Sequence, residues 1–176
     1  MAADMTLLEP DFGAKIETVL DNCLQRGCTL IPFFTLRDPW AQAKLWRQSR
    51  STASIRRMLQ VLSDADALFL AEVLESVGPQ NGRWATNCLP GQSWHQHGHA
   101  VDCFVAEKGG RSVWAPSHPA YEAYAQEAKA QGLVSGLYWS KRDAVHVQAT
   151  AGRVRDQYGW PEIDRMMRDR FEGERS

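Results

Sequence analysis

The sequence has no long apolar run and no excess of basic residues, and each absence excludes a class of protein. No stretch approaches the roughly 20 consecutive apolar residues that a membrane-spanning helix needs, so we expect no membrane insertion. The formal net charge is −1, whereas a phosphate-binding surface usually carries a basic excess, so we expect no nucleic-acid partner. With 44% hydrophobic and 23% charged residues, the composition is that of an ordinary globular protein.

The sequence also lacks the features of a secretory leader and of a cysteine-based zinc knuckle. Its first ten residues contain neither a basic stretch nor a long apolar stretch, so we expect synthesis in the cytoplasm without a conventional signal peptide. The four cysteines, none in a Cys-x-x-Cys pair, are Cys23, Cys28, Cys88 and Cys103. In the cytoplasm we expect reduced, buried thiols. In an oxidising compartment the alternative is a disulfide between Cys88 and Cys103, whose closed loop of about 15 residues would contribute roughly 3 kcal/mol.

The length of the chain indicates one domain over residues 1–176, because no repeat or low-complexity linker interrupts the sequence. Helical periodicity and capping residues predict helices at 10–26, at 39–48, in two pieces over 54–77, between 117 and 132, and from 161 onward. Short apolar or turn-bounded runs predict strands near 28–34, 84–88, 99–105, 111–114 and 145–149. Because helices and strands do not alternate strictly, the pattern favours an α+β fold over a doubly wound sheet.

The residues that can carry chemistry gather in two segments. The first, SWHQHGHAVD, runs from Ser93 to Asp102, and the second, DAVH, runs from Asp143 to His146. Imidazole and carboxylate are the ligands of reactive zinc sites, where a nearby carboxylate removes a proton from water. A continuous strand would place residues seven apart on opposite faces, so a bend is required within the first segment, and Gly98 is placed to provide it.

Two other interpretations of the histidines remain open. His95, His97 and His99 occupy alternate positions, so an unbroken strand would place all three on one face and could present them to a metal, as in a cupin-like barrel. Gly98 in the middle of the run argues against such a strand. The histidines could also be surface or core residues that bind no metal.

The two segments together resemble the signature of a known family. Ser-x-His-x-x-Gly-x-Ala-x-Asp at 93–102, followed by Asp-x-x-His at 143–146, is similar to the motif of the peptidase M15 family. That family includes D-alanyl-D-alanine carboxypeptidases, D-Ala-D-Ala dipeptidases and L-alanyl-D-glutamate endopeptidases, the last often phage endolysins. Pro-Gly-Gln at 90–92, Leu-Arg at 36–37 and Gln-Ala-x-Leu at 42–45 resemble the endopeptidase branch.

The resemblance implies a hedgehog/DD-peptidase fold, which is α+β with a small antiparallel sheet and flanking helices. It implies Zn²⁺ as the cofactor, with the metal ligands His95, Asp102 and His146. It also implies that Asp143 activates the zinc-bound water, and that Arg37 and Ser93 polarise or orient the substrate.

The chain departs from the family by a helical insertion at residues 51–82, and it ends in a C-terminal helix and tail at 160–176.

The activity that the resemblance implies is hydrolysis of amide bonds in the peptidoglycan stem peptide, with L-Ala-D-Glu endopeptidase first. The alternatives are a D,D-carboxypeptidase or dipeptidase of the same family, and a non-catalytic zinc-binding or wall-binding module. We expect a monomer that acts on the cell wall or in the periplasm after release or delivery. A holin, a secretion machinery or an immunity protein would then be its protein partner.

Overall fold

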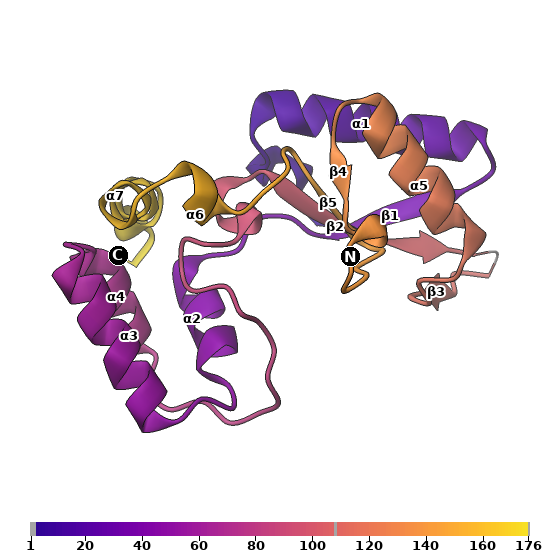
Figure 1. Cartoon of the computed structure of the whole chain (residues 1–176). Coiled ribbons are helices and arrows are strands. Elements are labelled where there is room, and N and C mark those ends of the chain that lie inside the picture. The colour runs from indigo at the N-terminus through magenta and orange to yellow at the C-terminus, as the bar shows by residue number, and fades with distance from the viewer. Residues whose placement is uncertain (1–2, 108, 176) are drawn as a thin grey trace. The chain divides into compact units, whose positions relative to one another are not determined.

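Helices and antiparallel strands are mixed along the chain, as the computed structural model shows (Figure 1). The structure describes residues 3–107 and 109–175. The chain divides into a sheet unit, Met1–Leu36 with His97–Ala151, and a helical unit, Arg37–Gln96 with Gly152–Ser176. The single domain predicted for residues 1–176 stays a prediction, because compact units do not by themselves define domains.

The sheet unit is built on an antiparallel sheet. Its strands are β1 (Thr29–Phe34), β2 (Ala100–Ala106), β3 (Ser112–Val113), β4 (Val134–Ser135) and β5 (His146–Gln148). They lie in the order β1-β2-β5-β4, with β3 also paired to β2. The register sets Asp102 of β2 opposite His146 of β5. Two residues far apart in the sequence therefore share one face of the sheet.

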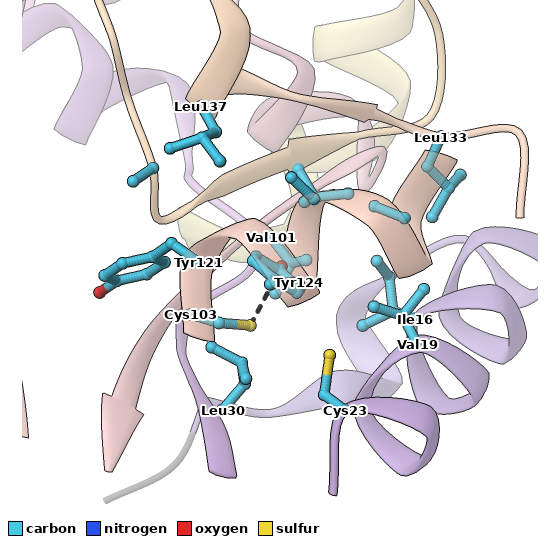
Figure 2. Packing of buried hydrophobic residues seen from close by; sticks show 14 of the residues in the cluster. Ile16, Val19, Cys23, Leu30, Val101, Cys103, Tyr121, Tyr124, Leu133 and Leu137 are labelled. Carbon is cyan, nitrogen blue, oxygen red and sulfur yellow. Dashed lines mark hydrogen bonds between the residues drawn. The ribbon is translucent and has the colours of Figure 1, made fainter. Parts of the chain in front are cut away.

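Two helices of this unit, α1 (Pro10–Gln25) and α5 (Pro119–Ala130), pack against each other and against the sheet (Figure 1). Helix α1 begins with a proline, and Gly27, at φ +76°, follows its C-terminal end. Between helices and sheet lies a hydrophobic core (Figure 2) that includes Ile16, Val19, Leu30, Val101, Cys103, Tyr121 and Tyr124. The Tyr124 hydroxyl donates to Sγ of Cys103 at 3.3 Å, so the polar tip of this buried ring is satisfied.

The alternation of β2 positions Asp102. Val101, Cys103 and Val105 are buried in the core, whereas Asp102 and Phe104 are only half-buried. Successive side chains of a strand point to opposite faces, so the burial of Val101 and Cys103 turns Asp102 to the other face.

The helical unit contains α2 (Pro39–Arg47), α3 (Thr52–Asp64), α4 (Leu68–Ser76), α6 (Val154–Gln157) and α7 (Trp160–Phe171). Helix α4 packs against α2, α3 and α7. The helical material predicted at residues 51–82 forms α3 and α4, while the C-terminal helix predicted at 160–176 is α7 with the short turn η4 (Glu172–Arg175). Ser176 lies outside the described residues.

Helix α7 supplies the N-terminal cap of α4. Ala67, at the N-cap position, makes no side-chain cap hydrogen bond. Instead, the backbone N–H of Leu70 donates to Oδ1 of Asp164 at 2.8 Å, and Oδ2 of Asp164 lies 3.1 Å from Nη2 of Arg168. Asp164 is buried, so its carboxylate satisfies an N–H that water does not reach and ties α7 to α4.

We expect Asp164→Ala to lower the free energy of unfolding by about 1–3 kcal/mol, because the Leu70 N–H loses its acceptor. Urea denaturation followed by circular dichroism measures the change. Asp164→Asn keeps an acceptor oxygen and should recover much of the loss. Equal stability of Asp164→Ala and the wild type would contradict the capping role.

The predicted α+β class, with a small antiparallel sheet and flanking helices, is confirmed, but one predicted strand is wrong. Residues 84–88 form no strand. The Trp84 indole N–H donates to Asn87, and the Arg50 guanidinium lies 3.8 Å from the Trp84 ring centroid and donates to the Thr86 carbonyl. Side-chain contacts therefore hold this segment, and it forms no ladder of backbone hydrogen bonds with a neighbouring strand. No helix in the described residues has the length and apolar character that crossing a membrane would require.

All four cysteines are free thiols. The disulfide considered between Cys88 and Cys103 assumed that residues 84–88 form a strand beside β2, and this assumption is wrong. Cys103 lies in the core, where burial raises the pKa of its thiol to about 12, and burial likewise raises the pKa of Cys23 to about 11. Both thiols are therefore protonated and unreactive near neutral pH.

Candidate metal centre

His95 lies on a short helical turn, η2 (Trp94–His97), that the preceding residues hold in shape. The Gln96 N–H donates to the Ser93 carbonyl at 2.9 Å, and the Gly91 N–H donates to Oε1 of the buried Gln96 at 2.8 Å. Gly91 has φ +82°, and a side chain there would meet Ile163 of α7. The chain then turns at Gly98, with φ +70°, and enters β2, as the predicted bend requires.

His146 and Asp102 face each other across β5 and β2. Nδ1 of His146 lies 3.0 Å from Oδ1 of Asp102, and its Nε2 lies 3.0 Å from Oε1 of Gln148. The Gln148 amide nitrogen donates to the Thr150 carbonyl at 2.6 Å, which turns the amide oxygen toward the imidazole. An amide oxygen only accepts, so Nε2 carries the proton in this bond and Nδ1 is the nitrogen that can bind a cation beside Asp102.

The surroundings of His146 favour positive charge. Burial by itself lowers the pKa of His146, but the hydrogen bond and charge of Asp102, with smaller contributions from Gln148 and Asp143, raise it above its usual value. The same carboxylates would stabilise a metal cation in place of the proton.

Three side chains can together hold a metal ion. His95, Asp102 and His146 each offer one ligand atom, and these atoms all lie within 4.8 Å of one another. Ligand atoms about 2.0–2.2 Å from a tetrahedral zinc are roughly 3.3–3.6 Å apart. The 3.0 Å between Nδ1 of His146 and Oδ1 of Asp102 is close to that range. Two imidazoles and one carboxylate therefore fit an ion that keeps a fourth position open.

Asp143 lies on a tight loop between η3 (Gly136–Tyr138) and β5. The Gly136 carbonyl accepts from the N–H groups of Trp139 at 3.2 Å and Asp143 at 2.9 Å. A Cβ on Gly136 would come within 2.5 Å of the Asp143 carbonyl oxygen, so this close approach requires glycine. The loop presents an exposed carboxylate whose charge reaches His146, and the Trp139 ring lies 5.1 Å from the His146 ring, centroid to centroid.

Arg37 and Ser93 lie beside His95 in the helical unit. The Arg37 N–H donates to the His95 carbonyl at 3.2 Å, and its guanidinium Nη1 donates to Oε1 of Gln42 at 2.9 Å. Gln42 is fully buried, and its Nε2 donates to the Cys88 carbonyl at 2.7 Å. Ser93, half-buried, immediately precedes η2. The buried amide therefore fixes the Arg37 guanidinium to the segment that leads to His95.

His97 and His99 do not belong to the group of potential metal ligands found among the described residues. The turn η2 contains His95 and His97, and β2 begins only at Ala100. The cupin-like alternative needs an unbroken strand through all three histidines and is therefore wrong. The His99 ring instead meets Phe12 edge to face, with the ring centroids 6.4 Å apart.

Two residues that shape the centre were not identified as such from the sequence. Gln148 accepts a hydrogen bond from Nε2 of His146. Gln148 lies two residues after His146 on the same strand, and this spacing could have indicated the contact. Gly136 makes room for the Asp143 carbonyl, and no local pattern indicates that contact, because it forms only when the loop closes.

Residues 87–149 match a peptidase M15 family model described as D-alanyl-D-alanine carboxypeptidase. Among solved structures, the crystal structure of the Serratia marcescens L-Ala D-Glu endopeptidase ChiX is similar at 21% identity and a TM-score of 0.44. The alignment covers 89% of this chain and 86% of that chain. The comparison with curated proteins gave no match. The segment that matches this family model contains all three potential metal ligands, His95, Asp102 and His146.

Proposed function

We propose that this protein is a zinc-dependent peptidase that hydrolyses amide bonds in the peptide of bacterial peptidoglycan. The observation that carries the proposal is the group of His95, Asp102 and His146, which lies on a segment matching a peptidase family. The exposed carboxylate of Asp143 on the adjoining loop favours catalysis over metal binding alone, because binding needs no general base.

In this proposal His95, Asp102 and His146 hold the zinc ion. When bound, zinc polarises the scissile carbonyl and makes a water molecule more acidic. Gln148 accepts a hydrogen bond from Nε2 of His146, which leaves Nδ1, on the side of Asp102, as the nitrogen that would bind the ion.

Proton transfer and charge stabilisation fall to other side chains. Asp143 accepts a proton from the attacking water at a carboxylate oxygen and returns it to the amine nitrogen of the leaving group. Arg37, whose guanidinium is held by Gln42, stabilises the developing oxyanion or binds a substrate carboxylate, and Ser93 orients the substrate.

Among the family's activities we favour the L-Ala-D-Glu endopeptidase, because the motifs at 36–45 and 90–92 resemble that branch. The second candidate is a D-alanyl-D-alanine carboxypeptidase, which is the description of the matching family model. Both activities cut the same stem peptide at different bonds. We further propose that the protein acts at the wall or in the periplasm, after release with a holin or delivery by a secretion machinery.

Digestion of isolated peptidoglycan by the zinc-loaded protein tests the proposal. Mass spectrometry of the products should reveal new L-alanine carboxyl and D-glutamate amino termini, whereas release of D-alanine would identify the carboxypeptidase. A chelator-treated sample should be inactive, and added zinc should restore its activity. Absence of any cleaved peptide, despite stoichiometric zinc, would contradict a peptidase function.

A further inference from the structure

A surface pocket of about 200 Å³ lies at the N-terminal end of α5 in the sheet unit. Residues of two segments line it, one over 116–122 and the other over 137–142. Two of its residues, Pro116 and Pro119, have a fixed backbone φ, which limits how far this side of the pocket can rearrange when a ligand binds.

The pocket carries both signs of charge. Arg142 and Glu122 line it, and within the described part of the chain no ion pair joins them. The Tyr138 hydroxyl donates to Oε1 of Glu122 at 2.8 Å, and Gln126 donates to the same oxygen at 3.1 Å. Among the described residues neither Oε2 of Glu122 nor the Arg142 guanidinium has a hydrogen-bond partner. The pocket therefore offers a carboxylate oxygen of Glu122 to a cation and the guanidinium N–H groups of Arg142 to an anion.

The pocket shares its loop with the metal centre. The segment that begins at Gly136 and ends at Asp143 is closed by the two hydrogen bonds to the Gly136 carbonyl. Tyr138 and Arg142 of this segment line the pocket, while Trp139 lies against His146. A ligand held by Arg142 is therefore bound at the residue that directly precedes the proposed general base.

We propose that this pocket binds an amino-acid head group, an ammonium together with a carboxylate, at the end of a substrate side chain. The ammonium faces Glu122 and the carboxylate faces Arg142. This inference rests on the proposed function and deepens it, because diaminopimelate in a stem peptide ends in such a group, whereas lysine at the same position ends in an ammonium alone. The pocket thus gives the peptidase a preference for diaminopimelate-containing peptidoglycan.

Two soluble tripeptides test the pocket, L-Ala-γ-D-Glu-meso-diaminopimelate and L-Ala-γ-D-Glu-L-lysine. Calorimetry with zinc-loaded Asp143→Ala protein measures their binding, and hydrolysis by the otherwise unchanged protein gives KM and kcat. We expect the diaminopimelate peptide to bind about five- to tenfold more tightly, with the difference in KM and little in kcat.

Variants of Arg142 and Glu122 test separately how the carboxylate and the ammonium of the head group are bound. Arg142→Ala should abolish the preference, and Arg142→Lys should keep part of it. Glu122→Gln retains the acceptor for Tyr138 but loses the charge, so it should weaken the binding of both peptides. Lys141→Ala is the matched control, because it removes a cation from the same loop without touching the pocket lining.

Equal binding of the two peptides by the wild-type pocket, or a preference that survives in Arg142→Ala, would overturn the inference. Failure of the peptidase itself looks different. In that case neither peptide is hydrolysed by the zinc-loaded protein, while the Arg142-dependent binding preference persists.

Discussion

His146→Ala is expected to lose both the bound metal and the peptidase activity. The substitution removes Nδ1, which lies 3.0 Å from the Asp102 carboxylate, and leaves two of the three ligands of the proposed centre. His95→Ala should have the same effect. Inductively coupled plasma mass spectrometry of the purified variants gives the metal content, and peptidoglycan digestion gives the activity. The wild type should contain about one zinc per chain.

Neighbouring residues provide graded controls for this prediction. His97→Ala and His99→Ala should keep the metal, because neither residue belongs to the ligand group. Gln148→Ala removes the acceptor that orients the His146 ring and should weaken metal binding by about 10–100-fold. Stoichiometric zinc in both His146→Ala and His95→Ala would show that the metal is bound elsewhere.

Asp143→Ala is expected to separate metal binding from catalysis. Its carboxylate is exposed and lies outside the ligand group, so the variant should retain zinc. General acid–base catalysis typically contributes roughly 10²–10⁴-fold, and the rate of peptide cleavage should fall by at least that factor. Metal content and cleavage rate must be measured on the same preparation, so that loss of zinc is not mistaken for loss of the base.

Asp169→Ala removes an exposed carboxylate from α7 and should leave the cleavage rate unchanged. Asp143→Asn preserves the size of the side chain and should be as inactive as the alanine variant, because an amide does not accept the proton. Full activity in Asp143→Asn would remove this residue from the mechanism.

The parts of the centre that lie close together in the sequence could be predicted from it. Gly98 adopts the left-handed conformation that the predicted bend requires, and a strand follows it near the predicted residues, so that its alternation turns Asp102 away from the buried Val101 and Cys103. These features depend on local spacing, and local spacing is visible in a sequence.

The features that sequence patterns missed depend on contacts between distant residues. Residues 84–88 contain apolar and β-branched side chains, but Arg50 stacks on Trp84 and donates to the Thr86 carbonyl, so no strand forms. The Asp164 carboxylate caps a helix almost a hundred positions earlier in the chain. No periodicity encodes either contact, because each partner has its own local pattern and the two meet only in the folded chain.

Both units are assembled from separated pieces of the chain, and this affects how the protein can be made. As the ribosome synthesises it, α1 and β1 emerge first, but β1 cannot pair until β2 has also emerged. In the same way, α4 must wait for α7 to deliver Asp164 to its first turn. A nascent chain that stops within residues 37–96 therefore contains β1 without β2, and α4 without the carboxylate that caps it.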